Sequence, residues 1–389
     1  MRRAVIVAGA RTPIGRSRKG KLATVDAFAL ARVAVSGVLD RVEIPRSDID
    51  DIVLAESMQG GGVIARHTAV ALGMSHVPGQ AVNRHCAAGL AAVQTAVATI
   101  RAEQADVVVA GGTESLTTMA RSMRPGPDGQ MAPWMPPSHP DTPEAPAFDM
   151  SITVGENTAR AAGLTRRDVD EWAAYSHGQA IASQDAGYFS DEILPVAVPQ
   201  QDGADLQVTE DEHPRRGVTV DTLAELPLLH PEIDGATVTA GNAAGVNDAA
   251  AAIVVTSEDY AKTHGLQPLA SVRSWGVAGV DPADTGLAPI GAIERALAKS
   301  KLTLGDIELW EINEAFCSVP VAVTRKMGID TAIVNVNGSG CSLGHPIAAT
   351  GARMIVTMLG ELRRRGASVG CVSMCAGGGM GSALVLELV

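Results

Sequence analysis

Aromatic residues are scarce in this sequence, since Phe, Trp and Tyr together account for 3% of its 389 residues. A chain of this length can bury an ample core, and here that core must consist of Ala, Val, Ile and Leu. Positive charge is also in short supply, because 31 Lys and Arg stand against 43 Asp and Glu, a formal net charge of -12. This balance argues against nucleic acid and against an anionic membrane surface as general partners.

Long apolar runs and paired cysteines are lacking too. No apolar run has the length of a membrane-spanning helix, so we expect no membrane partner. The cysteines are odd in number and include no C-x2-C pair of the kind that binds zinc. This favours free thiols and a reducing, cytoplasmic environment over disulfides or a metal site. The five cysteines are Cys86, Cys317, Cys341, Cys371 and Cys375.

Apolar strands alternate with helices in the first part of the chain. The expected strands are 4–7, 52–55, 80–83 and 106–110, and the expected helices are 26–39, 65–72 and 87–101. Buried strands that alternate with helices predict an α/β fold, with a parallel sheet covered on both faces.

A different pattern follows from Met119 to Ile233. Prolines are dense between Pro125 and Pro146, which predicts an irregular excursion that is neither helix nor strand. A helical pattern covers 155–186 with a break near 163–165, and a polar section follows it. We interpret 119–233 as an inserted loop domain that lies over the core as a lid or binding wall.

The last part of the chain repeats the first. A Val-Asn pair precedes Cys86 and a second one precedes Cys341, at an offset of 336 − 82 = 254 residues. A nearly equal offset, 306 − 51 = 255, relates the segments around Asp51 and Asp306. We therefore predict two similar α/β halves. The first comprises 1–118 and 234–265, and the second comprises 266–389.

Cys86 lies where an expected strand turns into an expected helix. We place it in the first turn of that helix, where free N–H groups and the helix dipole favour a thiolate. The alternative is a buried cysteine that acts as a small apolar residue.

Three later segments combine polar residues with the expected ends of strands. Asn313 follows the strand 307–310, where α/β proteins build their sites, although it could simply cap a helix. His345 stands before a proline in a glycine-rich loop and suits a catalytic base, although a structural role or a dinucleotide loop is also possible. Cys375 begins a glycine-rich turn whose N–H groups could face an oxyanion, or which could merely join two strands. Together with Cys86 they supply a nucleophile, a base and a second acid/base.

Four motifs in this order resemble the thiolases, the acyl-CoA C-acyltransferases, over essentially the full length of the chain. The segment around Cys86 (VNRHCAAG) is similar to the motif of the nucleophilic cysteine, and NEAF, GHP and C-x-GGG-x-G begin at Asn313, Gly344 and Cys375. The resemblance implies a thiolase-like fold of two α/β halves with mixed, mostly parallel sheets layered with helices as α-β-α-β-α, plus the inserted loop domain.

The resemblance also implies roles for these residues. Cys86 is acylated, and His345 activates it and binds the thioester oxygen. Asn313 holds a water in that oxyanion hole, and Cys375 moves the proton on the α-carbon of acetyl-CoA. The N–H groups of Cys86 and Gly377 stabilise the tetrahedral oxyanion.

The implied CoA site lies in and around the inserted domain. Arg215 falls near the adenine and phosphates, and Met150 covers the reactive pocket. The loop 241–245 is similar to the one that contacts pantetheine, but it has Ala244 where serine is common. Ala240 and Phe316 complete the implied substrate contacts. Other departures from the family pattern are Ala88, 339–342 and the proline-rich segment, and together they leave the acyl specificity open.

The expected activity is thiolytic cleavage of a 3-oxoacyl-CoA to acetyl-CoA and a shortened acyl-CoA, as in fatty-acid β-oxidation. The alternatives are the biosynthetic condensation of two acetyl-CoA molecules and a non-catalytic acyl-CoA-binding protein. A related condensing enzyme is disfavoured because those families lack the thiol of Cys375 in this setting. The resemblance implies CoA and acyl-CoA as substrates, no tightly bound cofactor, and a homo-oligomer that is a dimer or a dimer of dimers.

Overall fold

The structure is a computed structural model, and it describes residues 2–59, 61–200 and 203–389. Its strands are β1 (Ala4–Arg11), β2 (Gly15–Arg16), β3 (Asp51–Ala55), β4 (Gln80–Val82), β5 (Val107–Ser115), β6 (Ser122–Pro125), β7 (Met131–Trp134), β8 (Val196–Pro199), β9 (Asp205–Val208), β10 (Asn247–Ser257), β11 (Ala270–Gly279), β12 (Leu309–Ile312), β13 (Val369–Ala376) and β14 (Met380–Leu388). Its α-helices are α1 (Ala27–Leu39), α2 (Ile64–Ala71), α3 (Ala88–Arg101), α4 (Asn157–Ala161), α5 (Arg166–Asp185), α6 (Val220–Ala224), α7 (Glu258–Thr263), α8 (Ala288–Ser300), α9 (Ser318–Met327), α10 (Gly340–Leu343) and α11 (Ile347–Arg365).

The large sheet is mixed and runs in the order β12-β13-β14-β11-β1-β10-β5-β3-β4. The pairs β3–β4, β3–β5 and β12–β13 are parallel, whereas the other pairs along this path are antiparallel. The expectation of mostly parallel sheets was therefore wrong, although a mixed sheet layered with helices is confirmed. The physical reason is visible at β13 and β14, because a tight turn over 377–379 joins them and such a turn allows only antiparallel pairing.

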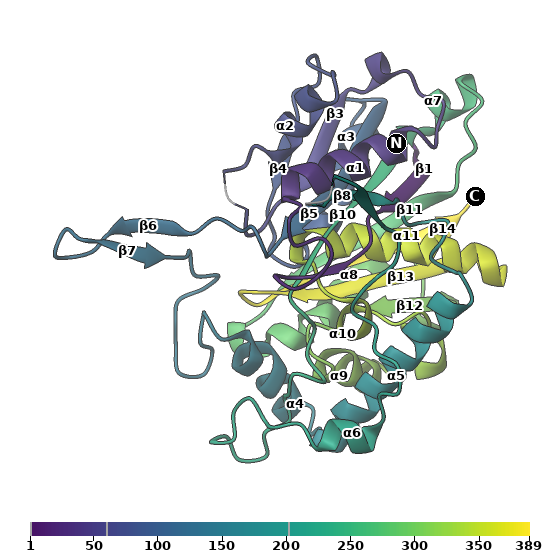
Figure 1. Ribbon diagram of the computed structural model, residues 1–389. Coiled ribbons are helices and arrows are strands. Elements are labelled where there is room, and N and C mark those ends of the chain that lie inside the picture. Colours follow the sequence, from purple (N-terminus) through teal and green to yellow (C-terminus); the bar gives the residue numbers. More distant parts are fainter. Residues whose placement is uncertain (1, 60, 201–202) are drawn as a thin grey trace.

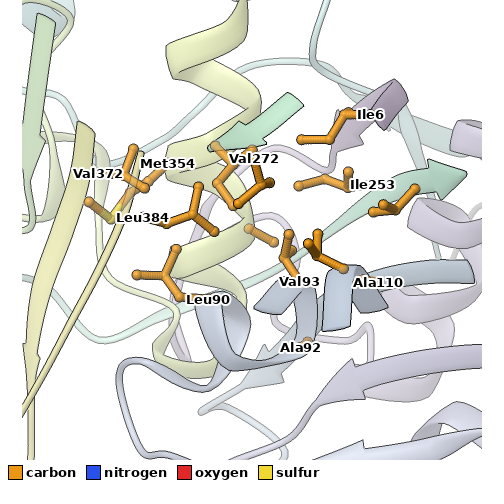
Figure 2. Close-up of a cluster of buried hydrophobic side chains, with 14 of the residues drawn as sticks. Ile6, Leu90, Ala92, Val93, Ala110, Ile253, Val272, Met354, Val372 and Leu384 are labelled. Atoms are coloured by element: carbon orange, nitrogen blue, oxygen red, sulfur yellow. The ribbon is translucent and has the colours of Figure 1, made fainter. Parts of the chain in front are cut away.

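Helices cover both faces of each half of this sheet. Strands β1 and β11 join the two halves through a short antiparallel contact. The halves enclose α3 and α11, whose apolar side chains pack against strands of both halves (Figure 1; Figure 2). Helices α1 and α2 cover the outer face of the first half, and α8 and α9 that of the second. This is the α-β-α-β-α layering, and it makes the central helix pair the core of the molecule.

Small residues allow α3 and α11 to touch at backbone distance. A Cβ added to Gly89 would lie 2.8 Å from the carbonyl oxygen of Ala348 and from the backbone nitrogen of Ala352. Gly351 on α11 lies equally tightly against the backbone of Leu90. Because the contact involves the first turn of each helix, it brings the two helix N-termini together.

The inserted section is partly regular. A hairpin of β6 and β7 projects from the molecule, so the expectation of no strand between 125 and 146 was wrong (Figure 1). Both strands of an isolated ribbon have a free edge, and proline is tolerated there because its missing N–H costs no ladder bond. The break near 163–165 is confirmed, since α4 ends at Ala161 and α5 begins at Arg166.

No helix in the described ranges is both long enough and apolar enough to cross a bilayer. Within the same ranges, no group of three or more His, Cys, Asp or Glu side chains is arranged to hold a metal ion.

Candidate active site

Cys86 lies directly before α3 rather than inside its first turn, because Ala87 is the residue that caps this helix. The preceding residue, His85, has a positive φ of 46°, which turns the chain sharply at the thiol. The backbone N–H of Gly377 points to the Cys86 sulfur, as does that of Cys86 itself. Burial nevertheless raises the pKa of Cys86 to about 11. The expected thiolate was therefore wrong for the resting protein, because desolvation outweighs the helix dipole.

His345 stands in the loop before α11, as Cys86 stands in the turn before α3, and the glycine contact brings the starts of these two helices together. Each residue stands three positions before one side of that contact, Cys86 before Gly89 and His345 before Ala348. The backbone N–H of His345 donates to Asn247 Oδ1 at 3.0 Å, which fixes the loop. Burial, followed by the charge of Arg353, lowers the pKa of His345 to about 4, so the imidazole is neutral.

Thr350 determines which nitrogen of His345 carries the proton. The Thr350 hydroxyl donates to the carbonyl oxygen of Pro346 at 2.9 Å, so its oxygen must accept from His345 Nδ1, 2.7 Å away. The neutral ring is then protonated at Nδ1. Its Nε2 is buried and has no hydrogen-bond partner among the described residues. This arrangement leaves a basic lone pair for a proton of the nucleophile or substrate.

Asn313 follows β12 directly, and its backbone forms a hydrogen bond whereas its side chain does not. The backbone N–H of Asn313 donates to Ser373 on the parallel neighbour β13 at 2.9 Å. Neither polar atom of its side-chain amide has a partner in the described part of the chain, although both are buried. Gly340 lies against this amide so closely that an added Cβ would be 2.6 Å from Oδ1. A buried amide with free donors and acceptors is suited to bind a water or a ligand.

Cys375 is the second-last residue of β13, two positions before the tight turn. Burial and the neighbouring Cys86 both raise the pKa of the Cys375 thiol far above its ordinary value. Cys375 is therefore a thiol rather than a thiolate at rest. The turn places the N–H of Gly377 at Cys86, so a thiol that can donate a proton and an N–H that can bind an oxyanion stand two positions apart.

Sequence reasoning missed Glu114, which lies on β5 behind the nucleophile. Its carboxylate accepts the N–H of Met58 at 3.1 Å, the side chain of Gln59 at 3.0 Å and the N–H of Ala348 at 3.2 Å. Burial raises the pKa of Glu114 to about 7, and its charge contributes to the raised pKa of Cys86. Glu114 therefore ties the start of α11 to the first half of the chain. Glu114 could have been identified from the sequence as an acidic residue at the end of an apolar strand.

The residues expected to contact CoA lie at different depths. Phe316 pairs with Ala243 through a β-bridge, and Ala244 donates its N–H to Ala315 at 3.0 Å, so this loop lines the approach to Asn313. Met150 lies close to the Gly377 turn, with its sulfur 3.8 Å from where a Cβ of Gly377 would be. Ala240 and Arg215 are exposed, and the Arg215 backbone donates to His177 Nδ1 at 3.2 Å.

Of the four residues singled out for chemistry, Cys375 lies near Cys86, and His345 stands just before the helix that contacts α3, whereas Arg215 and Ala240 lie at the surface. Asn247 and Thr350, which orient His345, were missed along with Glu114. Thr350 could have been suspected from its position one turn beyond the Gly-His-Pro loop, but Asn247 is distant in sequence. Chemically, the cluster offers a nucleophilic thiol, a neutral base, a second thiol acid and two sets of donors for anionic oxygens.

Two family models match the chain. Residues 4–259 match the N-terminal domain of thiolase, and residues 266–388 match the C-terminal domain of thiolase. The acetyl-CoA acetyltransferase of Cupriavidus necator is 40% identical to it, with 98% of each chain covered. The 3-ketoacyl-CoA thiolase of Bacillus subtilis is 38% identical, with 100% of each chain covered.

Solved structures of similar proteins have the same fold. The crystal structure of the Bacillus anthracis acetyl-CoA acetyltransferase gives a TM-score of 0.93 at 37% identity, covering 100% of this chain and 99% of that one. The crystal structure of human mitochondrial 3-ketoacyl-CoA thiolase gives a TM-score of 0.90 at 32% identity, with the same coverage.

Proposed function

Because this chain belongs to the thiolase family, we propose that it cleaves a 3-oxoacyl-CoA with CoA, releasing acetyl-CoA and a shortened acyl-CoA. Membership makes the chain an acyltransferase that uses CoA as a substrate and has no tightly bound cofactor. One observation carries the proposed chemistry: the thiol of Cys375 lies near Cys86, and two buried polar groups, Nε2 of His345 and the amide of Asn313, have no hydrogen-bond partner among the described residues.

The first half-reaction forms an acyl-enzyme. His345 Nε2 takes the proton of Cys86, and the sulfur attacks C3 of the 3-oxoacyl-CoA. The N–H groups of Cys86 and Gly377 stabilise the resulting alkoxide. Because both groups are neutral at rest, the proton moves only as negative charge develops on the substrate oxygen.

Cleavage of the C2–C3 bond leaves the acyl group on Cys86 and an enolate of acetyl-CoA. The protonated Nε2 of His345 and a water held by Asn313 stabilise the enolate oxygen. The Cys375 thiol gives its proton to C2, and acetyl-CoA leaves. The Cys375 thiolate then takes the proton of an incoming CoA thiol.

The second half-reaction returns the enzyme to its resting state. The CoA thiolate attacks the acyl carbon on Cys86, and the same two N–H groups stabilise the tetrahedral intermediate. Its collapse releases the shortened acyl-CoA, and Cys86 recovers its proton from His345. Kinetics of the ping-pong type follow from the covalent intermediate.

The reverse reaction, condensation of two acetyl-CoA molecules, uses the same groups and is a second candidate. It is supported by the similar relatives that are acetyl-CoA acetyltransferases by name. Initial rates of thiolysis across acyl chain lengths, measured beside the rate of condensation, distinguish the two roles. A fatty-acid degradation role in β-oxidation predicts efficient cleavage of chains longer than four carbons.

Substitution of the nucleophile provides the main test. We expect Cys86→Ser to abolish acylation of the protein by acyl-CoA, as seen in intact-mass spectra. The matched control is Cys371→Ser, since Cys371 is a buried thiol on the same strand as Cys375 but lies away from the site. Full acylation of the Cys86→Ser protein would assign the nucleophile elsewhere.

The CoA contacts are part of the same proposal. Ala244, Phe316 and Met150 would line the pantetheine channel, and Arg215 with Ala240 would contact the nucleotide end at the surface. Arg215 lies near His177, whose pKa is lowered to about 4 by burial and by the charges of Arg215 and Arg16. This local positive field, in a chain of net charge -12, supports binding of the CoA phosphates.

We also propose a homo-oligomer, a dimer or a dimer of dimers, in the cytoplasm. The outermost position of β4 in the described sheet and the projecting β6–β7 hairpin, with exposed Met123 and Met131, support self-association. A reducing environment is needed because Cys86 and Cys375 act as thiols. Light scattering coupled to size-exclusion chromatography measures the mass.

A further inference from the structure

The proline-rich segment 135–147, which the proposed mechanism does not use, closes over the catalytic turn. A Cβ added to Gly377 would lie 3.6 Å from both Cβ and Oγ of Ser138, and one added to Gly378 would lie 2.7 Å from the Ser138 carbonyl oxygen. The Gly377 N–H points at Cys86. Ser138 and Cys86 therefore flank the same glycine. Both are only partly buried, so Ser138 is accessible beside the proposed nucleophile.

His139 fixes the direction of the Ser138 hydroxyl. The buried ring of His139 contacts the carbonyl oxygen of Ala145 through Nε2 at 2.9 Å and Ser138 Oγ through Nδ1 at 2.8 Å. A carbonyl can only accept, so Nε2 carries the proton and Nδ1 of the neutral ring accepts the proton of Ser138. The lone pairs of Ser138 Oγ remain available. Ser138 thus presents an acceptor to the pocket.

His85, the residue before Cys86, presents a second polar group, and it lies near enough to His139, the partner of Ser138, to be affected by its charge. Its backbone is held in the positive-φ region, and its N–H donates to Asn83 Oδ1 at 2.8 Å. No hydrogen bond joins its imidazole to any residue that the structure describes, and the ring is partly exposed. Burial and the nearby His139 lower the pKa of His85, so the ring is neutral and offers one donor and one acceptor.

We propose that the acyl group transferred by this enzyme carries a hydroxyl, which binds between Ser138 and His85. A hydroxyl both donates and accepts, so it satisfies the Ser138 lone pair and the His85 N–H together. A purely alkyl chain would leave both groups desolvated and unpaired, which a site built for a hydroxyl penalises strongly. A carboxylate would face the Ser138 lone pairs without a cation, because the adjacent Arg84 directs its guanidinium to Gln94 Oε1 at 3.2 Å.

This specificity rests on the proposed thiolase reaction, and a comparison of four substrates tests it. The substrates are 3-oxohexanoyl-CoA, its 5-hydroxy and 6-hydroxy derivatives, and the analogue with a terminal carboxylate. We expect kcat/KM for the better hydroxylated substrate to exceed that for the alkyl and carboxylate substrates by about 10-fold or more. Equal rates, or preference for the alkyl or the carboxylate substrate, overturn the inference.

Two variants assign the preference to its residues. Ser138→Ala and His85→Phe are each expected to reduce the ratio of kcat/KM for hydroxylated over alkyl substrate to about one-tenth. The ratio is informative because a general loss of structure lowers both rates together. Ser190→Ala is the matched control, since Ser190 is an exposed serine whose hydroxyl contacts Gly187 far from the turn. An unchanged ratio in both variants also overturns the inference.

Failure of the underlying reaction has a different signature. Intact-mass spectra of wild-type protein mixed with each substrate report acylation of Cys86 directly. If no substrate acylates Cys86, the proposed function itself is wrong. If all substrates acylate it at equal rates in wild type and in Ser138→Ala, the thiolase reaction stands and only the hydroxyl preference is lost.

Discussion

Thr350→Val tests whether a single hydroxyl sets the protonation of His345, the proposed catalytic base. Valine has nearly the shape of threonine but cannot accept the proton of His345 Nδ1. The buried Nδ1–H then loses its only partner in the described structure, at a cost of about 1–3 kcal/mol. The ring escapes this cost by moving its proton to Nε2, and that removes the lone pair that faces the substrate. We therefore expect kcat/KM to fall about 5- to 150-fold, as 1.36 kcal/mol corresponds to a factor of ten.

Initial rates of 3-oxoacyl-CoA consumption measure this loss, and Thr350→Ser is the matched control because it keeps the hydroxyl. Alkylation of Cys86 by iodoacetamide between pH 6 and 12 gives an independent readout. It should slow in the Val variant at neutral pH, where the base assists the thiol, and converge with wild type above pH 11, where Cys86 is ionised. A folded Thr350→Val enzyme with kcat/KM within two-fold of wild type would refute the assignment of the tautomer.

Three other predictions concern packing, pH and CoA. Gly89→Ala should lower the free energy of unfolding by about 1–3 kcal/mol and reduce activity, because the added Cβ would lie 2.8 Å from the carbonyl oxygen of Ala348. The control is Gly178→Ala, at a helical position with open space around it, which should raise the free energy of unfolding in urea by about 0.5–1 kcal/mol. Glu114 has a folded pKa near 7, above the ordinary 4.5, so the stability it contributes is complete below pH 4.5 and is lost as pH rises through 7. Relative to Glu114→Gln, which does not titrate, the free energy of unfolding of the wild type should fall by about 3 kcal/mol as the pH rises from 4.5 through 7. If the free energies of the two proteins changed with pH in parallel, the raised pKa of Glu114 would be contradicted. Arg215→Ala should raise KM for CoA several-fold, most at low salt, while leaving kcat/KM for acyl-pantetheine thioesters unchanged; an equal effect on both substrates would remove Arg215 from the phosphate site.

The sequence predicted that Asn313 and Cys375 lie at one edge of the sheet. Asn313 follows β12 and Cys375 lies near the end of β13, and the ends of parallel strands converge at one edge, as those of β12 and β13 do. The repeat predicted two halves, and the apolar spacing predicted the first of the two central helices, α3. These features depend on local patterns of a few residues, which is why they could be predicted.

Other features depend on what the chain meets after folding. The protonation state of Cys86 was predicted incorrectly. The helix dipole can be inferred from the sequence, whereas burial of the thiol and the nearby charge of Glu114 arise only when the chain folds. The antiparallel strands escaped prediction because apolar runs do not encode direction. The β6–β7 hairpin escaped it because proline opposes a strand only where its neighbours need the missing N–H. Ser138 was not singled out because it lies in the proline-rich segment between Pro125 and Pro146, for which the sequence predicted no regular structure.

The central pair of helices has a consequence for how the protein is made. Helix α3 comes from the first half and α11 from the second, and they meet through Gly89 and Gly351, which are 351 − 89 = 262 positions apart. Closing so long a loop is slow, and neither half can cover its inner face before the other is complete. The first half must therefore leave the ribosome with α3 uncovered and wait for the last quarter of the chain. Since Cys86 and His345 stand just before the two helices that this contact joins, catalytic competence during refolding should appear together with this final docking and not before it.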